Sequence, residues 1–182
     1  NLDNADLLHE LEKDIKRLEK IADRFSKIGS QPQLSPRNIY EALDTSLLYM
    51  KSRVPDSIVI KTDYPNNKPI LININSELFE WVIENVCKNA VDAIGQQGKI
   101  FISVETHNNS VFIDIKDTGK GIHKKNFKTV FNPGYTTKNR GWGLGLSLVK
   151  RIIEQYHKGK VFVKQSEIGV GTTFRIVLKT SN

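Results

Sequence analysis

The first apolar residues of the chain recur at alternating steps of three and four, the spacing of a helix that packs against another helix. These positions are Leu8, Leu11, Ile15, Leu18, Ala22 and Phe25. Charged residues fill most of the positions between them, so the stripe needs a helical partner. A second copy of the chain would supply one, and an amphipathic helix lying on its own domain is the alternative. The pattern predicts an N-terminal helical arm over residues 1–30.

Three further helices follow from the same periodicity. Residues 29–36 are rich in Gly, Ser, Pro and Gln, which ends the arm, and a linker is expected at 31–36. Ser35 and Pro36 are typical of an N-cap and first turn, which predicts a helix to about residue 52. A long helix is expected from Asn75 or Ser76 to about residue 94, and another over residues 144–157. The inward positions of the first two are Ile39, Leu43, Leu47, Met50, Phe79, Val82, Val86, Ala90 and Ala93.

Alternating polar and apolar residues predict three pairs of strands. They cover residues 57–63, 70–74, 99–106, 110–116, 159–165 and 172–178. The first two pairs are expected to form hairpins, and the last pair flanks a turn at 167–171. A short helical piece is expected near residues 124–130. Strands in pairs between long helices predict the α+β class, a two-layer sandwich with a mixed sheet covered by helices on one face.

Composition narrows the class of protein. The 182 residues suffice for one domain, expected at 37–182, with a short appendage. No apolar run is long enough to span a membrane, and residues 1–6 do not resemble a signal peptide. The single cysteine, Cys87, lies in an apolar helical pattern, so we expect a core residue and a cytoplasmic location. The net charge of +7 suits a polyanionic partner. Charge alone does not choose between nucleic acid, an anionic membrane surface and a nucleoside triphosphate. Lys and Arg are scattered along the chain, which favours an ordinary solvated surface over a nucleic-acid-binding face.

Three polar residues share one face of the helix expected at 75–94. Asn85, Asn89 and Asp92 are separated by steps of four and three. A solvent-facing stripe is one interpretation, but Asn is a poor helix former, and two in register suggest a ligand. A carboxamide oxygen suits a Mg²⁺ ion that is held mainly by phosphates and water.

Two glycine-rich turns complete the candidate chemistry. Residues 117–122 leave a strand with an aspartate followed by glycines that allow close backbone approach, although plain turn chemistry would give the same pattern. Residues 141–146 hold three alternating glycines that lead directly into a helix, whose N–H groups can bind phosphate oxygens. The spacing matches neither a dinucleotide fingerprint nor a Walker loop.

In this order, the segments resemble the histidine kinase branch of the ATPase superfamily that includes gyrase, Hsp90, MutL and the histidine kinases. Residues 84–93 resemble its N box, 117–122 and 141–146 its two G boxes, 130–138 its F box, and 169–174 its closing glycine motif. The resemblance covers residues 34–178. It implies the Bergerat-type ATP-binding fold and the ATP-binding catalytic core of a two-component sensor histidine kinase.

The resemblance also implies roles for individual residues. Asn89 would bind Mg²⁺, Asn85 would support the phosphates and metal, and Asp117 would accept from the adenine amino group. With Lys138 near the phosphates, Asn85 and Asn89 form the implied catalytic set. Gly119 and Gly121 would make room for the base, and residues 131–140 would form a lid. The full implied ATP site is Asn85, Asn89, Asp92, Asp117, Gly119, Gly121, Ile122, Tyr135, Thr136, Thr137, Lys138, Arg140, Gly141, Gly143, Leu144, Gly145, Leu146 and Thr172.

The arm is similar to the second helix of the family's dimerisation domain, which implies a homodimer, a phosphoacceptor histidine and a response regulator receiver domain as partners. The first helix and the acceptor are expected to be absent. His9 lacks the family's following residues and is interpreted as a surface histidine. His157 is interpreted as a structural C-terminal cation or cap of its helix.

Two departures from the family bear on chemistry. Trp142 stands where the family has a small or polar residue, and it could stiffen the lid, cover the base or contact a partner. Asn85 stands where ATP-hydrolysing relatives place a glutamate, and a carboxamide cannot act as a general base, so slow hydrolysis is expected. In-line phosphoryl transfer to a histidine is the expected reaction. A serine kinase of the same fold and a degenerate nucleotide-binding module are the alternatives.

Overall fold

The computed structural model describes residues 32–64, 68–138 and 142–181. The chain divides between Gln33 and Leu34, and every element described below lies in the unit that begins at Leu34. The arm expected at 1–30, with His9, lies outside the described residues. So do Arg140 and Gly141.

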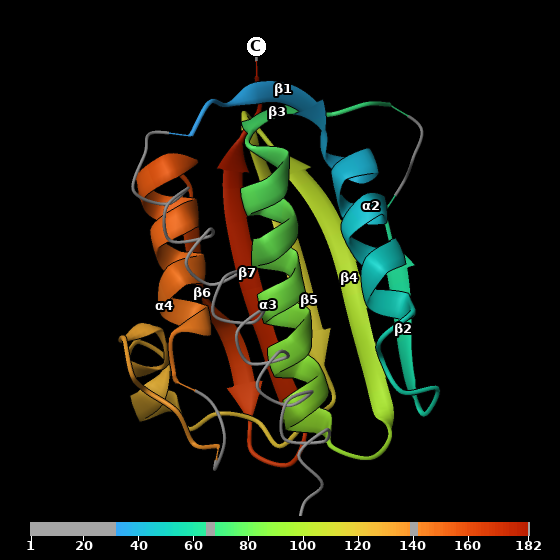
Figure 1. Cartoon of the computed structure of the whole chain (residues 1–182), viewed down its shortest axis with the longest axis vertical. Helices are drawn as coiled ribbons and strands as arrows, with labels where there is room; N and C mark the ends of the chain where they lie inside the picture. The colour runs from blue at the N-terminus through green and yellow to red at the C-terminus, as the bar shows by residue number, and fades with distance from the viewer. Residues whose placement is uncertain (1–31, 65–67, 139–141, 182) are drawn as a thin grey trace, which may run out of the picture. The chain divides into compact units, whose positions relative to one another are not determined.

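A five-stranded mixed sheet forms the core, in the order β2-β4-β5-β7-β6. Its strands are β2 (Ile58–Asp63), β4 (Gly98–His107), β5 (Ser110–Asp117), β6 (Lys160–Glu167) and β7 (Gly171–Lys179). β2 pairs with β4 in parallel, and the other neighbours are antiparallel. Figure 1 shows α2 (Ile39–Lys51), α3 (Ser76–Ile94) and α4 (Gly145–Arg151) on one face of this sheet. The predicted α+β sandwich and the β4-β5 hairpin are confirmed.

The hairpin predicted between the strands at 57–63 and 70–74 is wrong. β2 lies beside β4, whereas β3 (Leu71–Ile74) pairs antiparallel with β1 (Ser35–Asn38) in a separate two-stranded sheet. α3 lies between β2 and β4 in the chain and supplies the crossover that parallel pairing needs. The alternation of polar and apolar residues predicts which side chains of a strand are buried. It does not determine which neighbouring strand the backbone pairs with.

The first helix also begins later than expected. Ser35 and Pro36 lie in β1, because a fixed proline φ suits an extended strand as well as a first helical turn. Asn38 caps α2 instead: its Oδ1 accepts from the Tyr40 N–H at 3.3 Å, and its Nδ2 donates to the Glu41 carboxylate at 3.1 Å. The predicted inward positions of α2 are all buried.

α3 packs on β4, β5 and β7 through its apolar face. Asn75 is its N-cap and accepts from the Leu78 N–H at 3.1 Å. Phe79, Val82 and Val86 are fully buried, as predicted. Burial raises the pKa of the Cys87 thiol to about 12, so this cysteine is an unreactive core residue.

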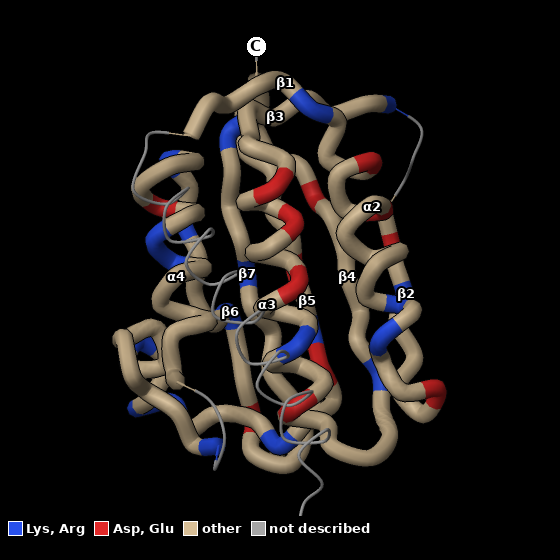
Figure 2. The backbone as a smooth tube through the Cα atoms, viewed as in Figure 1, with Lys and Arg blue, Asp and Glu red and all other residues tan. Residues whose placement is uncertain are grey.

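The second half of the unit contains two irregular regions. Two 3₁₀ turns, Lys124–Asn126 and Thr129–Phe131, replace the helical piece expected near 124–130. α4 continues directly as a π-helix, Ile152–Tyr156. Together they cover the helix predicted over 144–157. None of the described helices is long and apolar enough to cross a membrane. Basic residues occur on helices and strands throughout (Figure 2).

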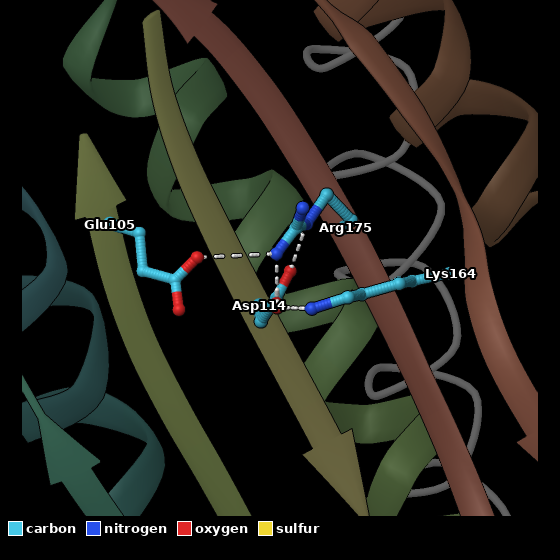
Figure 3. Close-up of polar contacts among 4 residues, drawn as sticks. All are labelled: Glu105, Asp114, Lys164 and Arg175. Atoms are coloured by element: carbon cyan, nitrogen blue, oxygen red, sulfur yellow. Dashed lines mark hydrogen bonds and ion pairs between the residues drawn. The ribbon is translucent and has the colours of Figure 1, made fainter. Parts of the chain in front are cut away.

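An ion network joins the strands on the sheet face away from the helices. Ile113 and Ile115 point into the core, so Asp114 between them points outward. Arg175 binds Asp114 through two nitrogens, at 2.6 and 2.7 Å, and Lys164 binds it at 2.7 Å (Figure 3). Burial opposes ionisation, but both cations hold the pKa of Asp114 below its usual range. The carboxylate therefore ties β5 to β6 and β7.

His157 caps the π-helix with an uncharged ring, so the expected cap is present and the expected cation is wrong. Its Nδ1 lies 3.0 Å from the Ile152 carbonyl, to which it donates, and its Nε2 accepts from the Asn75 N–H at 3.1 Å. Burial lowers the pKa of the imidazole. A nitrogen that accepts a hydrogen bond must be unprotonated, so this contact also requires the neutral ring. The predicted structural role is consistent with this geometry, which joins the end of the π-helix to the start of α3.

We predict that His157 makes the domain less stable as the medium becomes acidic. Its folded pKa lies below the unfolded value of about 6.5, so the unfolded chain takes up the proton first as pH falls. Its contribution is therefore complete above about pH 7 and declines below it, by at most about 1.4 kcal/mol per pH unit. Denaturant unfolding of the protein and of His157→Gln at pH 5 and 8 measures this. The stability advantage over the variant should shrink at pH 5, and an advantage that grows there would show a protonated ring.

Candidate functional site

Asp117 ends β5 as a buried carboxylate, 1% exposed. Its Oδ1 accepts from the Gly119 N–H at 2.8 Å and from the Thr172 N–H at 3.2 Å. Burial raises the pKa of this carboxyl, although the two N–H groups oppose the shift. No hydrogen bond within the described part of the chain engages Oδ2. One oxygen is therefore fixed, and the other is available to accept from a ligand.

The glycines after Asp117 allow neighbouring backbones to approach. A Cβ added to Gly119 would lie 2.6 Å from the Ala93 carbonyl carbon at the end of α3, and the Lys120 N–H donates to the Ala93 oxygen at 2.9 Å. Gly121 has φ +76°, and a Cβ there would strike the Glu167 carbonyl. The structure thus gives these glycines a packing role. Their expected role in making room for a base stays a prediction.

Ser166 connects the corner at residues 117–122 to the start of β7, and the sequence pattern did not indicate this role. Its hydroxyl accepts from the Ile122 N–H at 2.7 Å, donates to the Gly171 carbonyl at 2.9 Å and lies 2.9 Å from the Thr172 hydroxyl. The strand was expected to end at residue 165, whereas β6 continues past an irregularity between Val163 and Gln165. A small polar residue before a turn is a weak signal, because nothing local identifies a partner that lies 44 residues away.

The polar face of α3 carries Asn85, Asn89 and Asp92, as predicted. The two asparagines are half-buried and Asp92 is exposed. The Lys138 ammonium donates to Asn89 Oδ1 at 2.9 Å and to Asp92 Oδ2 at 2.6 Å. The expected lid thus lies against this face at Lys138. Asn85 donates from Nδ2 to the Trp81 carbonyl of its own helix at 2.8 Å.

The second glycine turn reaches the same face. Gly143 has φ +64°, and its carbonyl accepts from the Gly134 N–H at 3.1 Å, which joins this turn to the lid. A Cβ added to Gly145 would lie 3.0 Å from Asn85 Oδ1. The first residue of α4 therefore sits against Asn85 on α3.

Several other predicted site residues within the described ranges are not joined to this centre by hydrogen bonds. Thr136 accepts from the Lys138 N–H at 3.1 Å, which is a local turn contact. Within the ranges described, no hydrogen bond links Tyr135, Thr137, Leu144 or Leu146 to Asp117 or to the polar face of α3. Trp142 is 75% exposed.

The described residues contain no group of three His, Cys, Asp or Glu side chains that could hold a metal by itself. An octahedral cation bound here would therefore take most of its ligands from phosphates and water. The Asn89 Oδ1 atom suits a remaining ligand position of such a cation, because it already accepts a hydrogen bond from the cationic Lys138 ammonium.

The geometry fits a nucleotide-binding domain of the α+β class, with a carboxylate at one place and amides beside a glycine turn at another. Asp117 could take a hydrogen bond from a base, and the amide face with the α4 glycine turn could meet phosphates. Residues 74–182 match the histidine kinase-, DNA gyrase B- and HSP90-like ATPase family. The chain belongs to this family, which supports ATP as its nucleotide.

Individual relatives agree with this assignment. Sporulation kinase D of Bacillus subtilis is 28% identical over 94% of this chain and 34% of its own length. Sensor histidine kinase ZraS of Salmonella typhimurium is 31% identical over 97% of this chain and 38% of its own length. The chain therefore spans about a third of the length of these curated relatives.

Solved structures show the same fold. The nucleotide-free catalytic domain of histidine kinase ThkA superposes with a TM-score of 0.69 at 25% identity, over 81% of this chain and 95% of that one. ThkA in complex with response regulator protein TrrA gives a TM-score of 0.76 at 22% identity, over 96% of this chain and 51% of that one. The predicted resemblance to the ATP-binding catalytic domain of a histidine kinase is confirmed.

We predict that Gly121→Ala destabilises the domain more than Gly169→Ala. Both glycines have positive φ, but only Gly121 faces a backbone that a methyl group would strike, while Gly169 has open space. Strain at a positive φ is common to both, and the steric conflict should add about 1–3 kcal/mol at Gly121. Denaturant unfolding of both variants measures the difference. Equal losses would show that the contact between the corner and the β6-β7 turn is not tight.

Proposed function

We propose that this chain is the ATP-binding catalytic core of a sensor histidine kinase. It transfers the γ-phosphate of ATP to a histidine of a dimerisation domain, from which the phosphate passes to a response regulator. Its ATPase family, a sporulation kinase and two histidine kinases that it resembles support this reaction. The names of these relatives do not favour a serine kinase.

One observation carries the proposal: the Asp117 corner and the Asn89 face meet at the same end of α3. Lys120 binds the Ala93 carbonyl, and Asp92, the neighbour of Ala93, binds the lid lysine. A base bound at Asp117 would therefore place its phosphates along this end of the helix. If the Asp117 corner and the Asn89 face lay far apart, each would need its own ligand. Because they lie at the same end of α3, one nucleotide can contact both.

Asp117 would recognise the base through a hydrogen bond. Its available Oδ2 can accept from the adenine amino group, while the fixed Oδ1 keeps the carboxylate oriented. Guanine carries a carbonyl at the corresponding position, which would face another acceptor. Thr172 and Ile122 would line this end, with Gly119 and Gly121 setting the approach of the backbone.

The α3 face and the lid would hold the phosphates. Asn89 would hold Mg²⁺, which would supply positive charge against the phosphates when bound. Asn85 and Asp92 would complete this face, and Lys138 would contact the phosphates. The remaining members of the proposed ATP site come from the lid and the second glycine turn: Tyr135, Thr136, Thr137, Arg140, Gly141, Gly143, Leu144, Gly145 and Leu146.

Asn85 favours a phosphate donor over a hydrolase. Its amide nitrogen is committed to the Trp81 carbonyl, and an amide oxygen cannot take a proton from water. The γ-phosphate would therefore persist until an imidazole nitrogen attacks in line. Catalysis would consist of positioning and charge neutralisation by this chain.

The proposed partners extend beyond the described unit. Residues 1–30 would form part of the second dimerisation helix, followed by a linker and the catalytic domain. A homodimer in the parent protein and docking of a receiver domain follow from the proposed kinase cycle. ThkA, a structural neighbour, was crystallised with a response regulator protein, which supports this partner class. A cytoplasmic location suits the buried, reduced Cys87.

We predict saturable binding of ATP in Mg²⁺, with weaker binding by Asp117→Asn and Asn89→Ala. Replacing the acceptor Oδ2 of Asp117 with an amide removes a charged hydrogen bond, which should reduce affinity by at least tenfold. Asn89→Ala should reduce affinity in Mg²⁺ but have little effect on ADP binding in EDTA. Isothermal titration calorimetry measures both.

GTP and Glu80→Gln serve as controls. GTP should bind far more weakly than ATP, and Glu80→Gln should bind ATP normally because Glu80 lies on α3 outside the proposed site. Equal affinity for ATP and GTP would exclude Asp117 as the reader of the base. Absence of ATP binding by the unmodified chain would remove the proposal.

A further inference from the structure

Lys138 occupies the position on Asn89 that a cation would use. Its ammonium lies 2.9 Å from Asn89 Oδ1 and 2.6 Å from Asp92 Oδ2. Asn89 and Asp92 are three residues apart on α3, so the two oxygens face the same space. The lid lysine therefore bridges the Asn89 and Asp92 side chains.

An ammonium group and Mg²⁺ cannot occupy the same coordination position on one amide oxygen. Mg²⁺ binds oxygen ligands at about 2.0–2.1 Å, closer than the ammonium lies to Asn89, and the two positive charges repel each other. Lys138 must therefore leave Asn89 before a divalent cation coordinates there. Once free, the same ammonium is available to the phosphates.

We propose that Asp92 is a positioning residue that holds Lys138 across the cation site and thereby controls when the lid opens to nucleotide. This inference rests on the proposed function, because it assigns the order of events at the same site. Asp92 supplies the charge that holds the lysine, whereas Asn89 supplies only a neutral acceptor. Lys138 would leave Asp92 and Asn89 for the phosphates, which would make the Asn89 oxygen available to a cation.

The strength of the contact suits a reversible clamp. The side chains of Lys138 and Asp92 are 38% and 37% exposed, so water and salt weaken the ion pair. Such a pair shifts a two-state population by about two- to fivefold. After the lysine has moved, the exposed Asp92 carboxylate returns to water without a buried unpaired charge.

Amine labelling of the nucleotide-free chain in EDTA tests the clamp. Acetylation rates of Lys138 and of the exposed Lys88 on the same helix are measured together by mass spectrometry, so that Lys88 normalises each sample. Asp92→Asn should increase the relative rate at Lys138 about two- to fivefold. Asp92→Glu, which keeps the charge, should restore slow labelling. Glu80→Gln should leave the rate unchanged.

Association kinetics test the consequence for nucleotide. If opening limits cation binding, Asp92→Asn should increase the association rate of a fluorescent ADP analogue in Mg²⁺ by the same factor. The rate in EDTA should change less, because no cation then competes for Asn89.

The outcomes separate the clamp from the proposed function. An unchanged labelling rate at Lys138 in Asp92→Asn would overturn the clamp even if nucleotide binds well. Faster labelling with an unchanged association rate in Mg²⁺ would overturn control of lid opening. Faster labelling in a chain that binds no nucleotide would leave the clamp in place and remove the kinase function, and with it the proposed role in nucleotide entry.

Discussion

The apolar face of α3 is buried against the sheet, and this contact fixes the direction of every polar side chain on the helix. Fully burying a side chain such as Phe79, Val82 or Val86 contributes about 1.5–3 kcal/mol, so rotating the helix would be costly. Asn85, Asn89 and Asp92 consequently face away from the core, toward the second glycine turn and the lid. The hydrophobic core thus sets the geometry of the candidate site.

A second constraint joins the far end of the site to this helix. The Asp117 carboxylate is held by backbone N–H groups from two different segments, and Ser166 links those segments again. Because Lys120 binds the end of α3, the buried carboxylate and the amide face are parts of one rigid arrangement. The exposed Lys138 contact is weaker by comparison. A firmly held carboxylate at Asp117 and a more exposed contact at Lys138 suit the proposed nucleotide, with its base at the first and its phosphates at the second.

Sequence alone predicted the features that depend on local periodicity and on short motifs. Helix faces, the β4-β5 hairpin, the polar face of α3 and the glycine turns followed from spacing, and the ordered motifs identified the family. The partner of β2, the cap at Asn38, the neutral state of His157 and the role of Ser166 did not. Each of these depends on a contact between distant segments or between competing local conformations that the linear pattern does not determine. The Lys138 bridge likewise needed the folded lid.

Phosphoryl transfer is the most direct test of the kinase assignment. The chain is mixed with a separately produced dimerisation domain that carries a phosphoacceptor histidine and with γ-labelled ATP in Mg²⁺. The account predicts label on the added domain that is lost in acid and retained in alkali, as expected for phosphohistidine, and that depends on Asn89. Acid-stable label on a hydroxyl group, or release of free phosphate without labelling of the histidine, would contradict it.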